Sequence, residues 1–188
     1  MLDPEQEALA ALARGDRRRA TAILMHAFGD DVYRHCRLVL GREDLADEVH
    51  QNVFVCAYRD LDTWQGRAGL RTWLYAIARH RCLDALKLRR RWLRRFILSE
   101  RLPERHDPTA GADERLGSAD IARVVDAAMA RLAPEVRVAV ALRFFEGLSY
   151  EQMAEVCGAK PATLQMRVTR AMPRLRAWLE EMGVRDAG

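Results

Sequence analysis

The sequence predicts an all-α protein made of two small helical domains joined by a flexible linker. Between Pro4 and Pro103 there is no proline, and no strand-like alternation lasts long enough to compete with the helical period. Residues 96–118 lose that period and include two prolines, which is typical of a linker. Helical spacing returns near residue 119. We therefore predict an N-terminal extension at 1–14, a first domain at 15–95, the linker at 96–118 and a second domain at 119–184.

The first domain is predicted to begin with two helices. Gly15-Asp16 precedes an apolar helical stripe that continues to Gly41, with a break or bend at Gly29-Asp30. The next helix should run from Arg42 to about Trp64, because its apolar residues recur at helical spacing.

This second helix should present two different faces. Apolar residues four apart share one arc and are assigned to the core: Leu45, Val49 and Val53. Polar residues share a second arc of about 100°: Asp44, Asp47, Glu48 and Gln51. Acidic side chains near the start of a helix are stabilised by its dipole. The charge alone therefore leaves two interpretations open, a dipole-stabilised helix start or a surface that binds a basic partner.

A short loop and a long helix complete the first domain. Gln65–Gly69 is predicted to be a loop, with Trp64 at its edge in a surface role. Leu70 begins an apolar and aromatic helix in which Trp73 is assigned to the core. The extension of this helix, residues 79–95, becomes strongly basic.

The second domain is predicted to contain a helix that Pro134 starts and Gly147 ends. Its apolar stripe consists of Val136, Val140 and Phe144, four residues apart, which should face the core. This helix leads directly into the most informative segment of the chain.

The segment after Gly147 carries the signals of a helix-turn-helix. Ser149 and Gln152 form a capping box at the start of a short helix, and Gly158 supplies the turn. Pro161 suits the first turn of the second helix. In such a motif the second helix enters the major groove of DNA. A plain helical hairpin is the alternative interpretation.

The second helix of this motif has an inner and an outer face. Leu164 and Val168, four residues apart, can pack inward. Side chains on the outer face remain available for contact: Thr163, Gln165, Arg167 and Arg170. Pro173 should kink or end the helix just beyond this face.

The formal net charge is +4, and its distribution is more informative than its size. Residues 1–64 carry a net charge of −4, whereas residues 79–105 carry +7. From residue 160 to residue 179 there are five basic residues and no acid. This pattern favours one protein-binding surface and two surfaces that bind a polyanion.

No catalytic motif is present, so we expect no enzyme and no cofactor. The sequence contains no P-loop, no G-x-G-x-x-G and no G-x-S-x-G. The pairs His35-Cys36 and His80-x-Cys82 are poor metal ligands, because neighbouring helix positions point apart. The first residues lack the basic region and apolar run that are typical of a signal peptide, and no apolar run approaches the roughly 20 residues of a membrane span. We therefore expect a cytoplasmic protein with no membrane insertion of its own.

Four segments, in this order, are similar to motifs of one family. Residues 46–54 look like A-E-D-L-V-Q-E-V-F, and residues 71–80, with Asp84 and Lys87, look like R-x-W-L-x-x-I-A-R-N followed by D-x-x-R. Residues 142–154 look like L-R-x-x-E-G-L-S-Y-x-E-I-A, and residues 163–171 look like G-T-V-K-S-R-x-x-R-A. Together they resemble the extracytoplasmic-function (ECF) sigma factors of the sigma-70 family. The resemblance implies a region 2-like domain at 15–95 and a region 4-like domain at 119–184.

The resemblance also implies what each surface binds. The acidic helix would bind a coiled coil of core RNA polymerase through Asp44, Asp47, Glu48, Gln51 and Asn52. The loop and basic helix would bind the −10 promoter element, including a flipped base, through Trp64, Gln65, Arg67, Arg71, His80, Lys87 and Arg90. The helix-turn-helix would bind the −35 element through Lys160, Thr163, Gln165, Met166, Arg167, Thr169 and Arg170.

The chain departs from the family pattern at several of these positions. Asn52 stands where the family usually has Glu, and His80 stands where it usually has Asn. Gln165-Met166 replaces a basic residue and Ser, and Lys160 replaces a Ser cap. The resemblance therefore predicts the position of the DNA-reading face but not which bases it reads.

The expected partners are core RNA polymerase, promoter DNA and an anti-sigma factor, since members of this family are often held inactive by one. Two other functions account for less of the chain. A free-standing helix-turn-helix regulator leaves the acidic helix and the basic helix unexplained. A protein-interaction adaptor leaves the acid-free segment at 160–179 unexplained.

Overall fold

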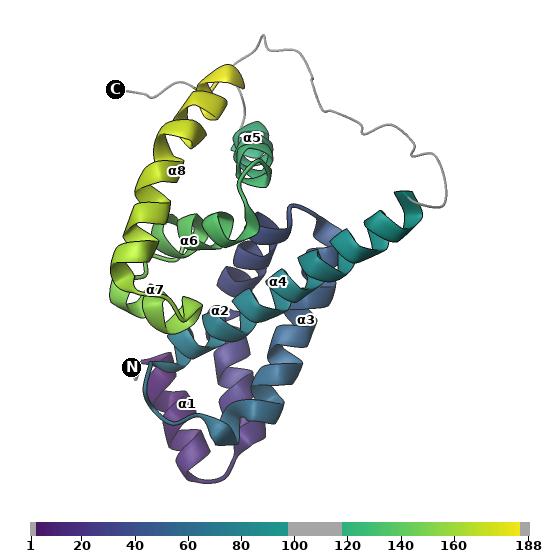
Figure 1. The fold of residues 1–188 in the computed structure, drawn as a ribbon. Helices are drawn as coiled ribbons and strands as arrows, with labels where there is room; N and C mark the ends of the chain where they lie inside the picture. The colour runs from purple at the N-terminus through teal and green to yellow at the C-terminus, as the bar shows by residue number, and fades with distance from the viewer. Residues whose placement is uncertain (1–2, 98–117, 185–188) are drawn as a thin grey trace.

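The computed structural model describes residues 3–97 and 118–184, and every regular element in these ranges is a helix. The predicted all-α class is confirmed. The helices are α1 (Pro4–Ala13), α2 (Arg17–Leu40), α3 (Glu43–Asp60), the short 3₁₀ helix η1 (Leu61–Thr63), α4 (Leu70–Ile97), α5 (Ser118–Ala130), α6 (Pro134–Phe144), α7 (Tyr150–Cys157) and α8 (Pro161–Glu181). Figure 1 shows α1 to α4 as one bundle, with α5 to α8 packed over one side of it. Most of the predicted linker, residues 98–117, lies outside the described residues.

One prediction for α2 is wrong. A break or bend was expected at Gly29-Asp30, but α2 continues as a helix from Arg17 to Leu40. Gly29 is buried, and its carbonyl oxygen accepts a hydrogen bond from Nε2 of His50 on α3, at 3.1 Å. Packing against α3 therefore outweighs the cost of about 1 kcal/mol that glycine imposes inside a helix.

The segment α1 is bound closely to the first domain. Its Ala8 and Ala11 pack with residues of α2, η1 and α4 in a small apolar cluster. The Glu5 carboxylate accepts hydrogen bonds from the backbone amides of Leu70 at 3.0 Å and Arg71 at 3.1 Å, and so caps the start of α4. A side chain at Gly69 would meet Glu5 Oε2 at 2.8 Å, which explains the glycine before this helix.

The helix-turn-helix forms as predicted, from α7 and α8. Both hydrogen bonds of the Ser149/Gln152 capping box are present. Gly158 adopts a left-handed conformation with φ of 61°, and Leu164 and Val168 are buried. The capping box, the glycine turn and the inward pair that the sequence predicted are therefore all present in the structure.

One prediction for the second domain is wrong. Phe144, assigned to the core face of α6, is 56% exposed, whereas Ala141 and Leu142 in the same turn are fully buried, so the core side of the helix lies away from Phe144. Pro173 was predicted to kink or end the last helix; α8 does not end there but continues to Glu181. Ala171 and Leu175, on either side of the proline, are buried, so packing on the core holds the helix through the one amide that proline removes.

The two domains share one continuous apolar core. Buried residues of α2 and α4, such as Val39 and Leu74, belong to the same cluster as buried residues of α6 and α8, such as Val140 and Leu164. The helix α2 contacts α5 and α6, and α4 contacts α6 and α7. The sequence predicted two domains but not this closed packing. In the part of the chain that the structure describes, no helix is long and apolar enough to cross a membrane.

Candidate polymerase and nucleic-acid surfaces

The exposed side of α3 forms an acidic face, which we define as Asp44, Asp47, Glu48, Gln51 and Asn52, all of them exposed. The opposite side of α3, with Val49 and Val53, is buried as predicted. Exposure on one side of a rigid helix makes this face accessible to a protein partner.

Local partners already occupy part of the acidic face. Arg42 Nη2 lies 2.5 Å from Asp44 Oδ2, and its hydrogen bond holds the pKa of Asp44 at about 2. Asn52 Oδ1 accepts a hydrogen bond from the Cys56 thiol, at 3.3 Å. Asp47 accepts a hydrogen bond from Tyr33 and thereby raises the pKa of that phenol. Asp47 and Glu48, the middle positions of the face along the helix, are its two carboxylates outside the Arg42–Asp44 ion pair.

The loop between η1 and α4 is held together by a hydrogen bond between its own residues. Trp64 Nε1 donates a hydrogen bond to the Ala68 carbonyl, at 3.0 Å, and Gly66 turns the chain with φ of 70°. Beside the loop lies a cavity of about 220 Å³, lined by Thr63, Trp64, Gln65, Arg67, Ala68, Thr72, Trp73, Ala76 and Glu155. Aromatic and basic side chains around such a cavity suit a stacked base with its phosphates, but Glu155, from α7, adds an acid.

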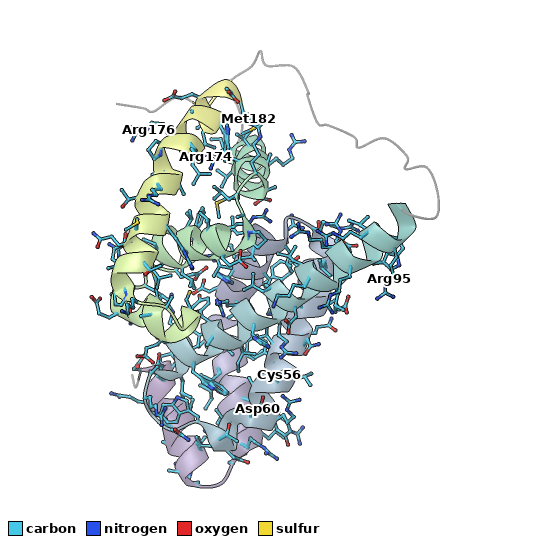
Figure 2. The ribbon with its side chains drawn as sticks, in the orientation of Figure 1. Cys56, Asp60, Arg95, Arg174, Arg176 and Met182 are labelled. Atoms are coloured by element: carbon cyan, nitrogen blue, oxygen red, sulfur yellow. The ribbon has the colours of Figure 1, made fainter. Side chains whose placement is uncertain are left out.

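The candidate residues on α4 differ in what they contact. His80 Nε2 lies 3.2 Å from Asp84 Oδ2, and Lys87 Nζ lies 3.7 Å from Asp84 Oδ1. Arg90 is exposed, and Figure 2 shows Arg95 near the end of α4 that projects beyond the other helices. Arg71 is different, because its guanidinium reaches into the contact between the two domains.

The outer face of α8 contains the residues predicted to read duplex DNA. Five of them are exposed: Thr163, Gln165, Met166, Thr169 and Arg170. Lys160, just before the helix, is also exposed, and Arg167 is half-buried. These side chains therefore occupy one outer surface over the first three turns of α8.

A buried polar cluster joins the two domains, and sequence reasoning missed it. Glu146, in the turn between α6 and α7, is 4% exposed, and its Oε2 accepts a hydrogen bond from the Tyr75 hydroxyl of α4. Arg71 Nη2 donates to the Glu146 carbonyl at 3.0 Å, and its guanidinium lies over the Tyr75 ring. His35 of α2 completes the cluster, with its Nδ1 at 3.9 Å from Glu146 Oε1.

Hydrogen bonding in this cluster is incomplete. Among the described residues, neither ring nitrogen of His35 nor Glu146 Oε1 has a hydrogen-bond partner. Burial raises the pKa of Glu146 and lowers the pKa of His35 from 6.5 to about 4. His35 is therefore neutral at pH 7, so its contact with Glu146 is not an ion pair.

Folding stability should depend on pH through His35. Above pH 6.5 both the folded and the unfolded chain hold a neutral imidazole. Below pH 6.5, His35 of the unfolded chain binds a proton, whereas His35 of the folded chain stays neutral down to about pH 4. The free energy of unfolding therefore falls as the pH falls. The loss should reach about 2 kcal/mol at pH 5, from 1.36 kcal/mol per pH unit. Urea denaturation at pH 7 and pH 5 measures it.

The variant His35→Leu isolates this effect. Leucine fills a similar volume and removes two unpaired nitrogens, so stability at pH 7 should be equal or higher. The charged groups around the site, Glu146, Asp31, Arg34 and Arg71, are the same in both proteins. The advantage of the variant should grow between pH 7 and pH 5; a constant difference would show that His35 is protonated in the folded state.

No site for a metal ion is evident among the residues that the structure describes, because no three His, Cys, Asp or Glu side chains converge. The residues considered as ligands have other contacts. Cys36 Sγ lies 3.7 Å from Cys82 Sγ inside the first domain, and His80 Nε2 lies 3.2 Å from Asp84 Oδ2.

These features define a class of protein: an all-helical protein of two domains, with an acidic face on α3 and a helix-turn-helix formed by α7 and α8. Comparison with known proteins identifies the family. Residues 24–94 match the Sigma-70 region 2 family, and residues 119–175 match the Sigma-70, region 4 family. The chain belongs to the sigma-70 family and is an ECF RNA polymerase sigma factor.

Relatives that align with most of this chain are ECF RNA polymerase sigma factors. It is 30% identical over 198 residues to the ECF RNA polymerase sigma factor ShbA of Streptomyces griseus, covering 96% of this chain and 100% of that protein. It is 32% identical over 165 residues to the ECF RNA polymerase sigma factor SigE of Mycolicibacterium smegmatis, covering 83% of this chain but 60% of that longer protein.

A solved structure shows the same fold. The sigma factor RpoE from Bartonella quintana, in complex with the anti-sigma factor NepR, matches with a TM-score of 0.66 and 22% identity, over 83% of this chain and 94% of that one. The match to the Sigma-70 region 2 family, at residues 24–94, includes α3 and all but the last three residues of α4. A free-standing helix-turn-helix regulator would leave these two helices without a role.

Proposed function

We propose that this sigma factor binds core RNA polymerase through the acidic face of α3 and directs the polymerase to promoters. The observation that carries the proposal is the separation of surfaces. The acidic face lies on one domain, whereas the acid-free outer face of α8 lies on the other. A subunit that joins a basic protein partner to DNA needs both kinds of surface. The chain would supply recognition in the cytoplasm, and the polymerase would supply the chemistry.

The −10 element would bind along the loop and α4. A base flipped out of the duplex loses its stacking, at a cost of a few kcal/mol, which a fitted aromatic cavity can offset. The cavity beside Trp64 and Arg67 supports this assignment. The exposed basic residues Lys87 and Arg90 would follow the phosphates of the unpaired strand.

The −35 element would bind to the outer face of α8 as duplex DNA. Gln165, Thr169 and Arg170 have side chains that can hydrogen bond base edges in the major groove, and Met166 can contact a thymine methyl group. Lys160 and Arg167, near the start of the helix, suit phosphates. An anti-sigma factor is a further partner that we propose, since the fold matches a sigma factor crystallised with one.

Replacing Arg170 should weaken promoter binding without weakening polymerase binding. Loss of one arginine contact to a base costs about 1–3 kcal/mol, so Arg170→Ala should reduce promoter affinity about ten- to hundredfold. The promoter is first found by runoff transcription on genomic fragments. Gel-shift titration of the reconstituted holoenzyme then measures the affinity.

The matched control is Arg174→Ala, one turn further along α8. Arg174 is exposed, and its guanidinium lies over the Trp178 ring, 5.1 Å from its centre. The control should therefore change promoter affinity much less. If Arg170→Ala reduces polymerase binding as much as promoter binding, the outer face of α8 at Arg170 is not the surface that binds the −35 element.

A further inference from the structure

The contact between the two domains is centred on one carboxylate. Glu146 enters the first domain from the α6–α7 turn and is held there by Tyr75 and Arg71 of α4, with His35 of α2 beside it. A second polar contact crosses the same boundary, where Arg137 of α6 donates to the Val39 carbonyl of α2 at 2.6 Å. The closed packing therefore depends on specific polar groups as well as on apolar area.

The closed packing places an acidic side chain of α7 beside part of the proposed −10 surface. A cavity of about 460 Å³ lies between α3, α4 and α7, and its lining includes Arg79 and His80 of α4 with Glu155 and Cys157 of α7. Cys56 and Asp60, labelled on α3 in Figure 2, also line it. Glu155 reaches the cavity beside Trp64 as well. A carboxylate at that position repels a phosphate, so the closed arrangement is unsuited to nucleic acid.

Arg71 is removed from the DNA surface in the same way. Its guanidinium donates to the Glu146 carbonyl and lies 3.9 Å from Glu146 Oε2. An arginine that neutralises a buried carboxylate is not available for a phosphate. Glu146 and a DNA phosphate would therefore compete for the same arginine, Arg71.

We propose that Glu146 is an autoinhibitory clasp, which keeps Arg71 engaged and Glu155 beside the −10 surface of the region 2 domain until the two domains separate. The inhibitory meaning rests on the proposed function, whereas the clasp itself rests only on the contacts described. The clasp suits a reversible device because it is incompletely satisfied. Three buried polar atoms, two on His35 and one on Glu146, regain water when the domains part.

The chain contains its own reporter of domain opening. Cys157, the last residue of α7, is half-buried beside Arg79 of α4 and lines the cavity between the domains. Cys36 and Cys82 are fully buried inside the first domain. Opening of the domains should expose Cys157 and leave Cys36 and Cys82 protected, whereas unfolding should expose all three.

Iodoacetamide alkylation of the free full-length chain, followed by peptide mass spectrometry, tests the clasp. Tyr75→Phe removes one hydroxyl and keeps the ring, and Glu146→Ala removes the carboxylate. Each should raise the alkylation rate of Cys157 by about tenfold, the effect of losing one buried hydrogen bond on an opening equilibrium. Glu180→Ala, at an exposed position of α8, is the control and should change nothing. An unchanged Cys157 rate in both variants, or a parallel rise at Cys36 and Cys82, overturns the clasp.

Binding of a short, fluorescein-labelled single-stranded DNA of mixed sequence tests the inhibition. Tyr75→Phe should bind this DNA several-fold more tightly than the wild type, because opening frees Arg71 and moves Glu155 away from the −10 surface. Equal affinity in a variant whose Cys157 is exposed overturns the inhibitory role. If the proposed function fails instead, neither protein binds the DNA, while the Cys157 result still stands.

Discussion

Binding to core RNA polymerase should weaken about a hundredfold or more when Asp47 and Glu48 are both replaced by lysine. Both side chains are exposed near the centre of the acidic face, so the substitution leaves the core of α3 intact. Against a basic target, each reversal removes an attraction and adds a like-charge repulsion, and such juxtaposition costs several kcal/mol. A pull-down or fluorescence titration with core polymerase measures the change, which should be largest at low salt.

The control must separate the position of the charges from their number. Asp3→Lys with Glu180→Lys changes the net charge by the same amount at exposed positions outside α3. This control should bind core polymerase almost as well as the wild type. If it is as weak as the α3 variant, binding follows overall charge. If the wild type does not bind core polymerase at all, the proposed function is wrong.

The local elements of the fold could be predicted because their causes are local. The capping box at Ser149, the left-handed Gly158 and the inward pair Leu164 and Val168 all lie within a few turns of one another. The α3 core stripe is equally local. Predictions failed where a distant contact overrode a local preference. Gly29 stays helical because α3 packs against it, and α8 continues through Pro173 because its neighbours are buried.

The residues that join the domains could not be predicted in this way. Glu146 and Tyr75 are 71 residues apart, and Arg137 and Val39 are 98 apart. Periodicity reports which face of a helix is apolar but not which helix it meets. A charged residue on a predicted helix also looks like a solvent-exposed one. The only local sign was the position of Glu146 directly before Gly147, where a turn directs a side chain away from its helix.

For the site residues, too, local positions could be predicted and contacts with distant residues could not. The sequence predicted exposed residues on α3 and α8 by their spacing, and these positions are exposed except Arg167, which is half-buried. What they bind stays a prediction. For Arg71 the structure adds a contact that the spacing could not reveal, because its partner belongs to the other domain.

The largest loss of stability is expected at Arg137. This arginine is 7% exposed, and it donates hydrogen bonds to the carbonyls of Val39 at 2.6 Å, Ala130 at 2.7 Å and Leu132 at 3.0 Å. The α2 and α5 helices end at Leu40 and Ala130, so the guanidinium lies at the negative ends of two helix dipoles. One side chain thus satisfies three carbonyl groups that have few alternatives.

Arg137→Ala should reduce the free energy of unfolding by about 3 kcal/mol or more, because it leaves buried carbonyls without donors and opens a cavity. For a chain of this size the midpoint of thermal unfolding should fall by about 6–12 °C. Circular dichroism during heating and urea titration measure both quantities.

The control Arg131→Ala removes an exposed arginine that pairs with Glu181 at 3.2 Å, and it should cost less than about 1 kcal/mol. Arg137→Lys keeps the charge but not the planar fork that reaches three acceptors, so its stability should lie between those of the wild type and Arg137→Ala. If Arg137→Lys is as stable as the wild type, charge at the helix ends is the stabilising factor. If Arg137→Ala is as stable as Arg131→Ala, water replaces the guanidinium at no cost, and Arg137 does not hold the two helix ends together.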